Sequence, residues 1–143
     1  MVAREFGASS RFSAVHETPA AEPVAALQHF RSKLAFETDP ADLFADTQKG
    51  RRDFVVIDAR SRDAFLGGHI PGAVNLPSRQ ISAETVGQLP RETVLVSYCW
   101  GPGCNGSTKA AAKLAALGFQ VKELIGGIEY WQRDGYPLAT GDP

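Results

Sequence analysis

Both cysteines of the chain, Cys99 and Cys104, lie in one short glycine-rich stretch. It reads Tyr98-Cys99-Trp100-Gly101-Pro102-Gly103-Cys104-Asn105-Gly106-Ser107-Thr108-Lys109. Glycines let such a loop curl until successive backbone N–H groups point inward and form a concave anion site. A thiol at the start of this loop has its thiolate stabilised and its pKa lowered, which makes it a nucleophile near neutral pH. The pattern predicts chemistry through an anionic sulfur, such as a persulfide or a thiophosphate intermediate.

The elements on either side of the loop are predicted to hold Cys99 in place. The apolar run at residues 93–98 predicts a strand, and helical spacing of apolar residues predicts a helix over residues 107–117 that ends at Gly118. The N-terminus of that helix adds partial positive charge to the loop. Cys99 therefore follows the carboxyl end of a strand, which is where open parallel sheets bind their ligands.

Strands and helices alternate through the rest of the chain. Apolar runs predict further strands at 54–57, 73–76 and 119–125, whereas helical spacing and caps predict helices at 23–34, 40–49, 61–65 and 128–134, with a helical turn from residue 82. Continuous apolar runs are typical of strands buried on both faces. We therefore predict one α/β domain with a mostly parallel central sheet flanked by helices.

The domain is expected to span residues 23–139, with residues 23–35 as an additional N-terminal helix. Residues 1–22 lack periodicity and read as a flexible tail, without the basic start and apolar core of a signal peptide. Residues 140–143 read as a short C-terminal tail.

Composition narrows the classes of function. The chain has 143 residues, 43% of them hydrophobic and 22% charged, with a net charge of -1, which argues against disorder and gives no sign of a nucleic-acid partner. No apolar run reaches the ~18 residues of a membrane span. Two cysteines and three scattered histidines suggest neither a disulfide framework nor a structural metal site. We expect a cytoplasmic protein with no metal or other cofactor and no membrane partner.

Four stretches together resemble the single-domain rhodaneses, the thiosulfate:thiol sulfurtransferases. The resemblance spans residues 36–137 and implies a three-layer α/β fold. It rests on Val56-Ile57-Asp58-Ala59-Arg60 with Phe65 and His69-Ile70-Pro71-Gly72-Ala73-Val74-Asn75-Leu76-Pro77, on Tyr98-Cys99, on Ser107-Thr108-Lys109-Ala110-Ala111 through Leu117-Gly118-Phe119, and on Gly126-Gly127 with Trp131, Gly135, Tyr136 and Pro137.

The resemblance implies a persulfide cycle on Cys99. The cysteine would take a sulfane sulfur from thiosulfate, a polysulfide or a persulfidated protein and pass it to a thiol or cyanide, while loop amides hold the sulfur anion. No oligomeric state is indicated. The residues expected to bind substrate are Trp100, Gly101, Gly103, Cys104, Asn105, Gly106, Ser107 and Thr108, with Arg60; Asp58 and His69 are expected to support the site.

The loop departs from the common pattern of this family. It is two residues longer between Cys99 and Ser107, and its first basic side chain is Lys109. Cys104 is therefore an alternative nucleophile, a thiol that resolves an oxidised Cys99, or a packing residue. The longer loop is also similar to that of dual-specificity phosphatases, but it lacks the arginine that clamps a phosphate dianion. A sulfur-relay or binding module with little turnover, and a phosphatase-like enzyme, are the alternative functions.

Several neighbours of the loop have two interpretations. Asp58 and Arg60 either reach substrate or pair with each other and brace adjacent loops, and His69 is expected to fix the proline turn that follows it. Trp100 either walls the site or packs with Trp131 and Tyr130. Ser107 and Thr108 are predicted to cap the helix, and Asn105-Gly106 to supply a positive φ.

Overall fold

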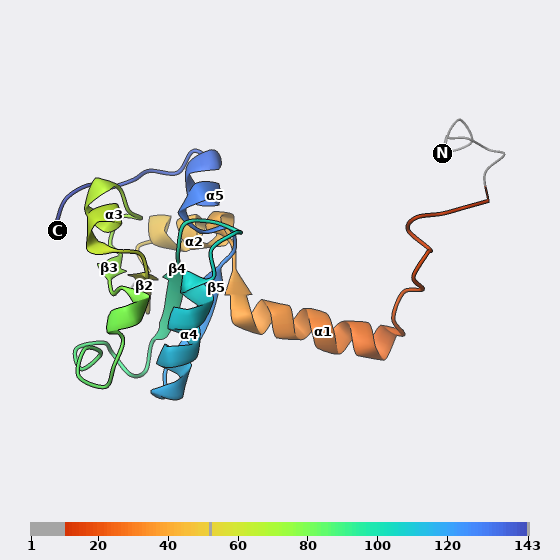
Figure 1. Cartoon of the computed structure of the whole chain (residues 1–143), viewed down its shortest axis with the longest axis horizontal. Helices are drawn as coiled ribbons and strands as arrows, with labels where there is room; N and C mark the ends of the chain where they lie inside the picture. Colours follow the sequence, from red (N-terminus) through yellow and green to blue (C-terminus); the bar gives the residue numbers. More distant parts are fainter. Residues whose placement is uncertain (1–10, 52, 143) are drawn as a thin grey trace. The chain divides into compact units, whose positions relative to one another are not determined.

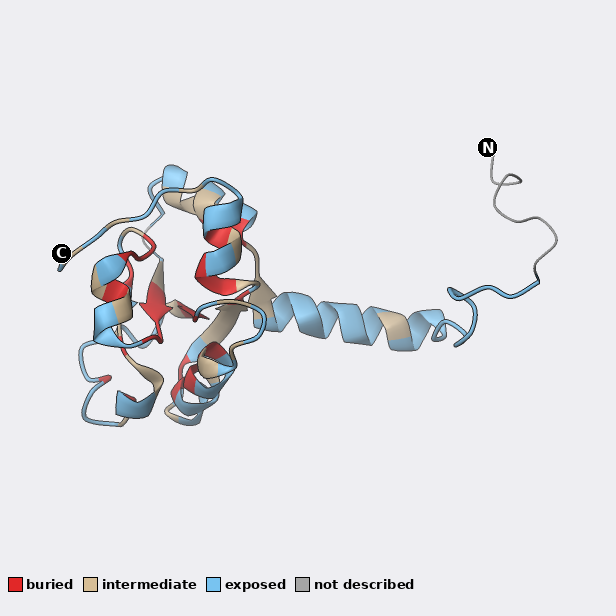
Figure 2. Cartoon of the chain, turned by 45° about the horizontal axis from the view of Figure 1, so that its top comes forward, coloured by how far each residue is buried: buried red, intermediate tan, exposed pale blue. Residues whose placement is uncertain are grey.

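The computed structural model describes residues 11–51 and 53–142 (Figure 1). The chain divides into two units between Ser32 and Lys33. The first unit holds a turn at Ser13–His16 and most of helix α1 (Pro23–Phe36). The predicted helix at 23–34 is confirmed, and none of the α1 residues is buried (Figure 2). Residues 1–10 of the predicted tail and Pro143 lie outside the described residues.

The second unit is built on a parallel sheet whose order is β1-β5-β4-β2-β3. Its strands are β1 (Glu37–Thr38), β2 (Phe54–Asp58), β3 (Val74–Asn75), β4 (Val94–Tyr98) and β5 (Gln120–Leu124). The four predicted strands are confirmed, and β1 adds a short edge strand beside β5. In the register of the central pair, Asp58 lies beside Tyr98, so β2 and β4 end at the same level.

Helices cover both faces of the sheet, which confirms the predicted α/β fold class. They are α2 (Pro40–Gln48), α3 (Arg62–Gly67), α4 (Gly106–Ala116) and α5 (Gly127–Arg133), with a 3₁₀ helix η2 (Ser78–Gln80). Asp39 caps α2 and Ser61 caps α3, because each side chain accepts a hydrogen bond from a backbone N–H in the first turn of its helix. The stretch after Ser82 forms hydrogen-bonded turns, including one helical bond from Val86 N to Ser82 O.

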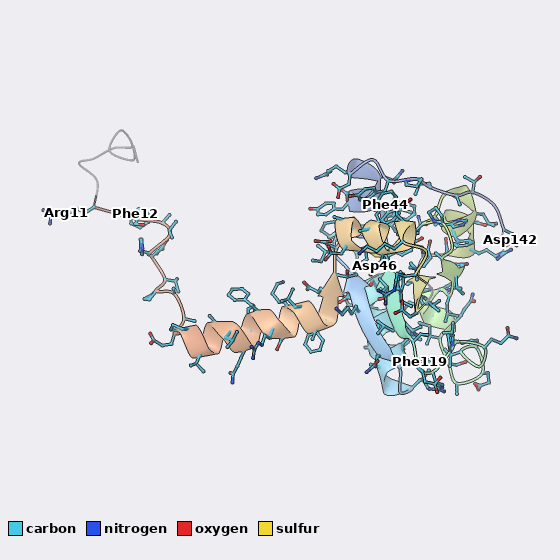
Figure 3. The ribbon with its side chains drawn as sticks, turned by 180° about the vertical axis from the view of Figure 1, so that it is seen from behind. Arg11, Phe12, Phe44, Asp46, Phe119 and Asp142 are labelled. Atoms are coloured by element: carbon cyan, nitrogen blue, oxygen red, sulfur yellow. A yellow bond between two sulfur atoms is a disulfide. The ribbon has the colours of Figure 1, made fainter. Side chains whose placement is uncertain are left out.

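Two hydrophobic clusters fill the space on the two sides of the sheet. Alternate strand residues point to opposite faces, so Val56 and Val96 join α2, α3 and α5 in one cluster, whereas Ile57 and Leu95 join α4 in the other. Phe44, labelled in Figure 3, packs against the first cluster, and Phe119 belongs to the second. The sheet therefore lies between two layers of helices. Across the described part of the chain, no helix combines the length and hydropathy needed to cross a membrane.

Candidate active site

Cys99 is the first residue after β4, at the carboxyl edge of the sheet where sequence analysis places it. Its backbone is fixed by the first turn of α5, because Cys99 O accepts from Ile128 N at 3.0 Å and Trp100 O accepts from Glu129 N at 2.9 Å. The residue is only 6% exposed. The sheet and α5 together hold the backbone that carries the thiol.

The loop after Cys99 turns back so that its two sulfur atoms meet. Cys104 N donates to Gly101 O at 3.0 Å, which closes a tight turn. Cys99 and Cys104 form a disulfide, with their Cα atoms 6.4 Å apart. The two cysteines therefore lie together in the candidate site rather than in separate parts of the loop.

Helix α4 begins at Gly106, one residue earlier than predicted, directly beside the two sulfurs. Gly106 N donates to Cys104 Sγ at 3.4 Å. A Cβ atom at Gly106 would lie 2.9 Å from Cys99 Sγ and 3.4 Å from Cys104 Sγ, so the missing side chain leaves room for both sulfur atoms. The helix start therefore approaches the disulfide with its backbone alone.

The predictions for the start of this helix are wrong in two respects. Asn105 is the N-cap residue with φ −98°, and Gly106 is not among the glycines with positive φ, so the pair does not supply a positive φ. Ser107 and Thr108 lie inside the helix and do not cap it. The Ser107 hydroxyl instead hydrogen-bonds the hydroxyl of Ser97 in β4 at 2.8 Å, and Thr108 Oγ1 donates to Glu123 Oε2 at 2.9 Å. These contacts fasten the first turn of α4 to the sheet.

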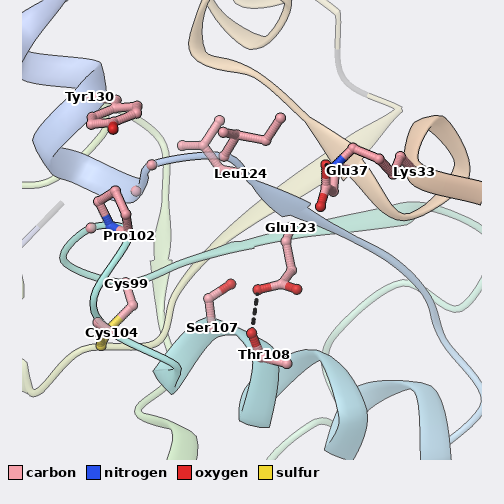
Figure 4. Close-up of a pocket in the computed structure, with 14 residues that line it drawn as sticks. Lys33, Glu37, Cys99, Pro102, Cys104, Ser107, Thr108, Glu123, Leu124 and Tyr130 are labelled. Atoms are coloured by element: carbon pink, nitrogen blue, oxygen red, sulfur yellow. Dashed lines mark hydrogen bonds and ion pairs between the residues drawn. A yellow bond between two sulfur atoms is a disulfide. The ribbon is translucent and has the colours of Figure 1, made fainter. Parts of the chain in front are cut away.

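A cavity of about 360 Å³ opens beside the cysteines (Figure 4). Its walls come from the cysteine loop, the start of α4, the end of β5 and the start of α5, together with Lys33 and Glu37. The loop and helix residues that line it are Cys99, Gly101, Pro102, Cys104, Ser107 and Thr108; the remaining ones are Glu123, Leu124, Ile125, Gly126, Gly127 and Tyr130. Trp100, Gly103, Asn105, Gly106 and Arg60, which were expected to bind substrate, are not among its lining residues.

The charged side chains around this cavity are mostly acidic. Lys33 Nζ pairs with Glu37 Oε1 at 3.3 Å, which offsets the only cation among the lining residues. Glu123 carries a further carboxylate, held by Thr108. Glu123 is not among the site residues predicted from the sequence, although it lies near the carboxyl end of β5, beside β4. The signal that would have found it is the strand order, which periodicity alone does not provide.

Arg60, which was expected to bind substrate, does not line the cavity, because its side chain is held by Asp58 and by the backbone at Gly68. Its Nη2 donates to Asp58 Oδ2 and to Gly68 O, both at 2.7 Å, and its backbone N donates to Asp58 Oδ1 at 2.9 Å. The pair is buried, with the side chains 2% and 0% exposed. The alternative prediction, that Asp58 and Arg60 brace neighbouring loops, is the one the structure shows.

Tyr98 completes this buried network. Its hydroxyl donates to Asp58 Oδ2 at 2.6 Å and accepts from Ile70 N at 3.1 Å. Burial, followed by the charge of Asp58, raises the pKa of Tyr98 well above its usual range. Burial lowers the pKa of Arg60, but hydrogen bonding and charge attraction from Asp58 outweigh it and leave that pKa raised. The network links the strand end that precedes Cys99 to the turn at residues 68–70.

Trp100 and His69 also have structural contacts. Trp100 is 55% exposed, and its ring lies 4.5 Å from Arg60 Cζ, so it neither walls the cavity nor packs with Trp131. The His69 ring is buried, donates from Nδ1 to Phe65 O at 2.8 Å and stacks on the Phe65 ring. The His69 side chain therefore contacts α3, which precedes it, rather than the proline turn that it was expected to fix. Among the described residues, no group of three or more His, Cys, Asp or Glu side chains is arranged to hold a metal ion.

Most of the second unit matches a known protein family. The family model for the rhodanese-like domain matches residues 40–134. The crystal structure of BH2092 protein from Bacillus halodurans superposes with a TM-score of 0.82 at 48% identity, covering 83% of this chain and 87% of that one. Thiosulfate sulfurtransferase GlpE of Pseudomonas syringae is 37% identical over 87 residues, which are 60% of this chain and 78% of that protein.

Some relatives are considerably longer than the matched region. The HTH-type transcriptional regulator Rv0324 of Mycobacterium tuberculosis is 31% identical over 91 residues, which are 64% of this chain. The chain spans only 40% of that protein's length. The residues matched by the family model contain strands β2 to β5, helices α2 to α5 and the cysteine loop.

Proposed function

Since the chain belongs to the rhodanese-like domain family, we propose that it is a sulfurtransferase in which Cys99 carries a sulfane sulfur as a persulfide. The observation that supports this most directly is the position of Cys99, immediately after the central strand β4, beside the start of α4 and on the wall of the cavity. The backbone N–H groups in the first turn of α4 lack partners within the helix and carry partial positive charge. They favour an anionic sulfur at this place.

In the proposed cycle, the Cys99 thiolate attacks the outer sulfur of the donor. With thiosulfate, the bond between its two sulfurs breaks, sulfite leaves, and Cys99 becomes a persulfide. A thiophilic acceptor, such as cyanide or a thiol, then removes the outer sulfur and restores the thiolate. Charge remains on sulfur throughout, so the cycle needs electrostatic stabilisation rather than a general base.

The charge around the cavity favours donors that are less anionic than thiosulfate. Residues 99–108 carry no Lys or Arg, Lys33 is paired with Glu37, and Glu123 adds a negative charge. A dianion in this cavity meets the Glu123 carboxylate in addition to the Lys33–Glu37 pair. No unpaired cation among the described lining residues balances its charge. We therefore place persulfides and organic polysulfides, which carry less negative charge on their sulfur chain, ahead of thiosulfate as donors.

The proposal is tested by loading the reduced Cys104→Ser protein with thiosulfate and, separately, with cysteine persulfide, and by measuring its intact mass. Only Cys99 can carry sulfur in this variant, because the chain has two cysteines. We expect one added sulfur atom, its removal by cyanide as thiocyanate, and no addition to Cys99→Ser. Absence of the adduct with both donors contradicts the proposal, and rapid hydrolysis of an aryl phosphate would favour the phosphatase-like alternative.

A sulfur-relay module with little turnover of its own is the second candidate, and the absence of a basic side chain in residues 99–108 favours it. Such a module takes up one sulfur and holds it until a partner protein removes it. A turnover assay with excess donor and cyanide distinguishes the two, because a relay module loads sulfur in the mass experiment but releases little thiocyanate over many minutes.

A further inference from the structure

The second cysteine lies where it can react with sulfur bound to the first. Cys99 and Cys104 are bonded in the native loop, and their Cα separation of 6.4 Å is within the usual range for disulfides, about 4.4–6.8 Å. The backbone at Cys99 is held by Ile128, and that at Cys104 by the turn to Gly101. The loop thus brings the two sulfurs together while each end keeps its backbone contacts.

The surroundings of Cys104 favour a reactive thiolate. Gly106 N, at the start of the 11-residue helix α4, points at Cys104 Sγ from 3.4 Å. A hydrogen bond and the positive end of a helix both stabilise a thiolate. The absent side chain of Gly106 leaves room for both sulfurs in this position.

We propose that Cys104 is a second catalytic residue, which resolves the persulfide on Cys99 and releases its outer sulfur as sulfide. This inference rests on the proposed function of Cys99. The Cys104 sulfur attacks Cys99 Sγ, a bond forms between them, and the bond from Cys99 Sγ to the outer sulfur breaks. The outer sulfur leaves with the electron pair as hydrosulfide, and the proton of Cys104 passes to the departing sulfide or to water. The two cysteines are oxidised to the disulfide, and the sulfane sulfur is reduced to sulfide.

An external dithiol then completes the cycle. Its first thiolate attacks one sulfur of the disulfide and forms a mixed disulfide with the protein. Its second thiol then attacks the dithiol sulfur of that mixed disulfide and releases the protein cysteine. The dithiol is thereby oxidised, and both cysteines are restored as thiols. Cys99 is buried whereas Cys104 is partly exposed, so the attack falls on Cys104 Sγ and Cys99 leaves as the thiolate. The net reaction converts a sulfane donor and a dithiol into sulfide and a disulfide, which is a reductase activity in addition to sulfur transfer.

The test follows the fate of one sulfur atom in the absence of added reductant. Wild-type protein is reduced with dithiothreitol, freed of it, and treated with thiosulfate or cysteine persulfide; Cys104→Ser, Cys104→Ala and Cys99→Ser are treated in parallel. Free sulfide and the intact mass under non-reducing conditions are followed with time, and the sulfide found with Cys99→Ser is subtracted as background.

We expect each wild-type chain to release one sulfide and then stop, with a mass lower by two hydrogen atoms. The Cys104 variants should keep the added sulfur and release no sulfide. Adding dithiothreitol to wild type should restart release. Wild-type protein that holds its added sulfur as long as Cys104→Ser does overturns the proposal, as does sulfide release by Cys104→Ser at the wild-type rate. Failure of the Cys104 variants to load sulfur from either donor overturns the proposed function itself. That outcome differs from failure of the Cys104 proposal alone, in which the variants still load sulfur.

Discussion

Gly127 lies against the carbonyl group of Cys99: a Cβ atom at Gly127 would be 2.5 Å from Cys99 O, and φ at this glycine is +60°. The next residue, Ile128, donates its N–H to the same oxygen. The close approach lets the first turn of α5 fix the backbone of the proposed nucleophile. The Gly126-Gly127 pair, which also lines the cavity, is therefore a part of the candidate active site, although neither residue contributes a side chain.

Gly127→Ala is expected to lower both stability and sulfur loading. The left-handed backbone alone costs a residue with a Cβ roughly 1–2 kcal/mol, and relief of the close contact must displace the Cys99 carbonyl. We expect a lower free energy of unfolding in urea and slower loading of Cys99, measured in the Cys104→Ser background. Gly135→Ala is the matched control, because Gly135 has φ +83° and nothing within 4 Å of its added Cβ. Equal behaviour of the two variants would show that the contact with Cys99 has no effect.

The buried Asp58–Arg60 pair is expected to be a major contributor to stability. Removal of one partner leaves an unpaired charge inside the protein, which typically costs about 3–5 kcal/mol. Asp58→Ala should therefore unfold at much lower urea concentrations than wild type. Asp142→Ala provides the control, because Asp142 pairs with Arg62 at the surface, where the side chains are 59% and 57% exposed. Surface pairs contribute little, so similar losses in the two variants would contradict the assignment of Asp58 and Arg60 to a buried structural network.

Tyr98→Phe is expected to change how stability depends on alkaline pH. Burial and the charge of Asp58 raise the pKa of Tyr98 in the folded protein, whereas an unfolded tyrosine ionises at about pH 10. Above that pH the unfolded chain binds fewer protons than the folded one, so stability falls as pH rises. At neutral pH the variant should be less stable by about 1–3 kcal/mol, because Asp58 and Ile70 N lose a partner.

The measurement is urea unfolding of both proteins between about pH 7 and 11, a range that brackets the tyrosine pKa. The stability difference between wild type and Tyr98→Phe should shrink as pH rises through the upper part of this range. Parallel curves would mean that Tyr98 ionises equally easily in both states.

The fold and the position of Cys99 could be predicted from sequence because they depend on local patterns. Short apolar strands that alternate with helices, and a thiol directly after one of them, leave few alternatives in a parallel sheet. The two-residue strand β1 has no such pattern, because Glu37 and Thr38 become a strand only through their pairing with β5. The helix start was misplaced by one residue, since the hydroxyls at 107 and 108 bond to the sheet instead of to the helix end.

Which side chains reach the candidate site depends on the three-dimensional path of the chain, and the spacing of residues along the sequence does not give that path. Arg60 follows a strand end, as a substrate-binding residue would, but its side chain turns back onto Asp58. Glu123 comes to the cavity because β5 lies next to β4. The pairing of Cys99 with Cys104 depends on the path of a loop whose Cα separation no sequence rule gives.

Glu123→Gln is expected to improve the use of thiosulfate relative to an uncharged donor. Figure 4 shows the Glu123 carboxylate turned towards Thr108 at the cavity that holds Cys99. The amide keeps an oxygen that can accept from Thr108 but removes one negative charge. The interaction of unit charges a few ångströms apart is about 1 kcal/mol in water, which corresponds to a several-fold rise in the loading rate of the dianion.

The informative quantity is the ratio of Cys99 loading rates with thiosulfate and with a neutral organic trisulfide, measured in the Cys104→Ser background. We expect the ratio to rise several-fold in Glu123→Gln and the gain to shrink as salt screens the charges. Glu37→Gln is a useful comparison, because Glu37 is already paired with Lys33 and its loss frees a cation as well as removing an anion. An unchanged ratio in Glu123→Gln at low salt would show that the charge of the cavity does not select the donor. Thiosulfate would then be as good a candidate donor as a persulfide.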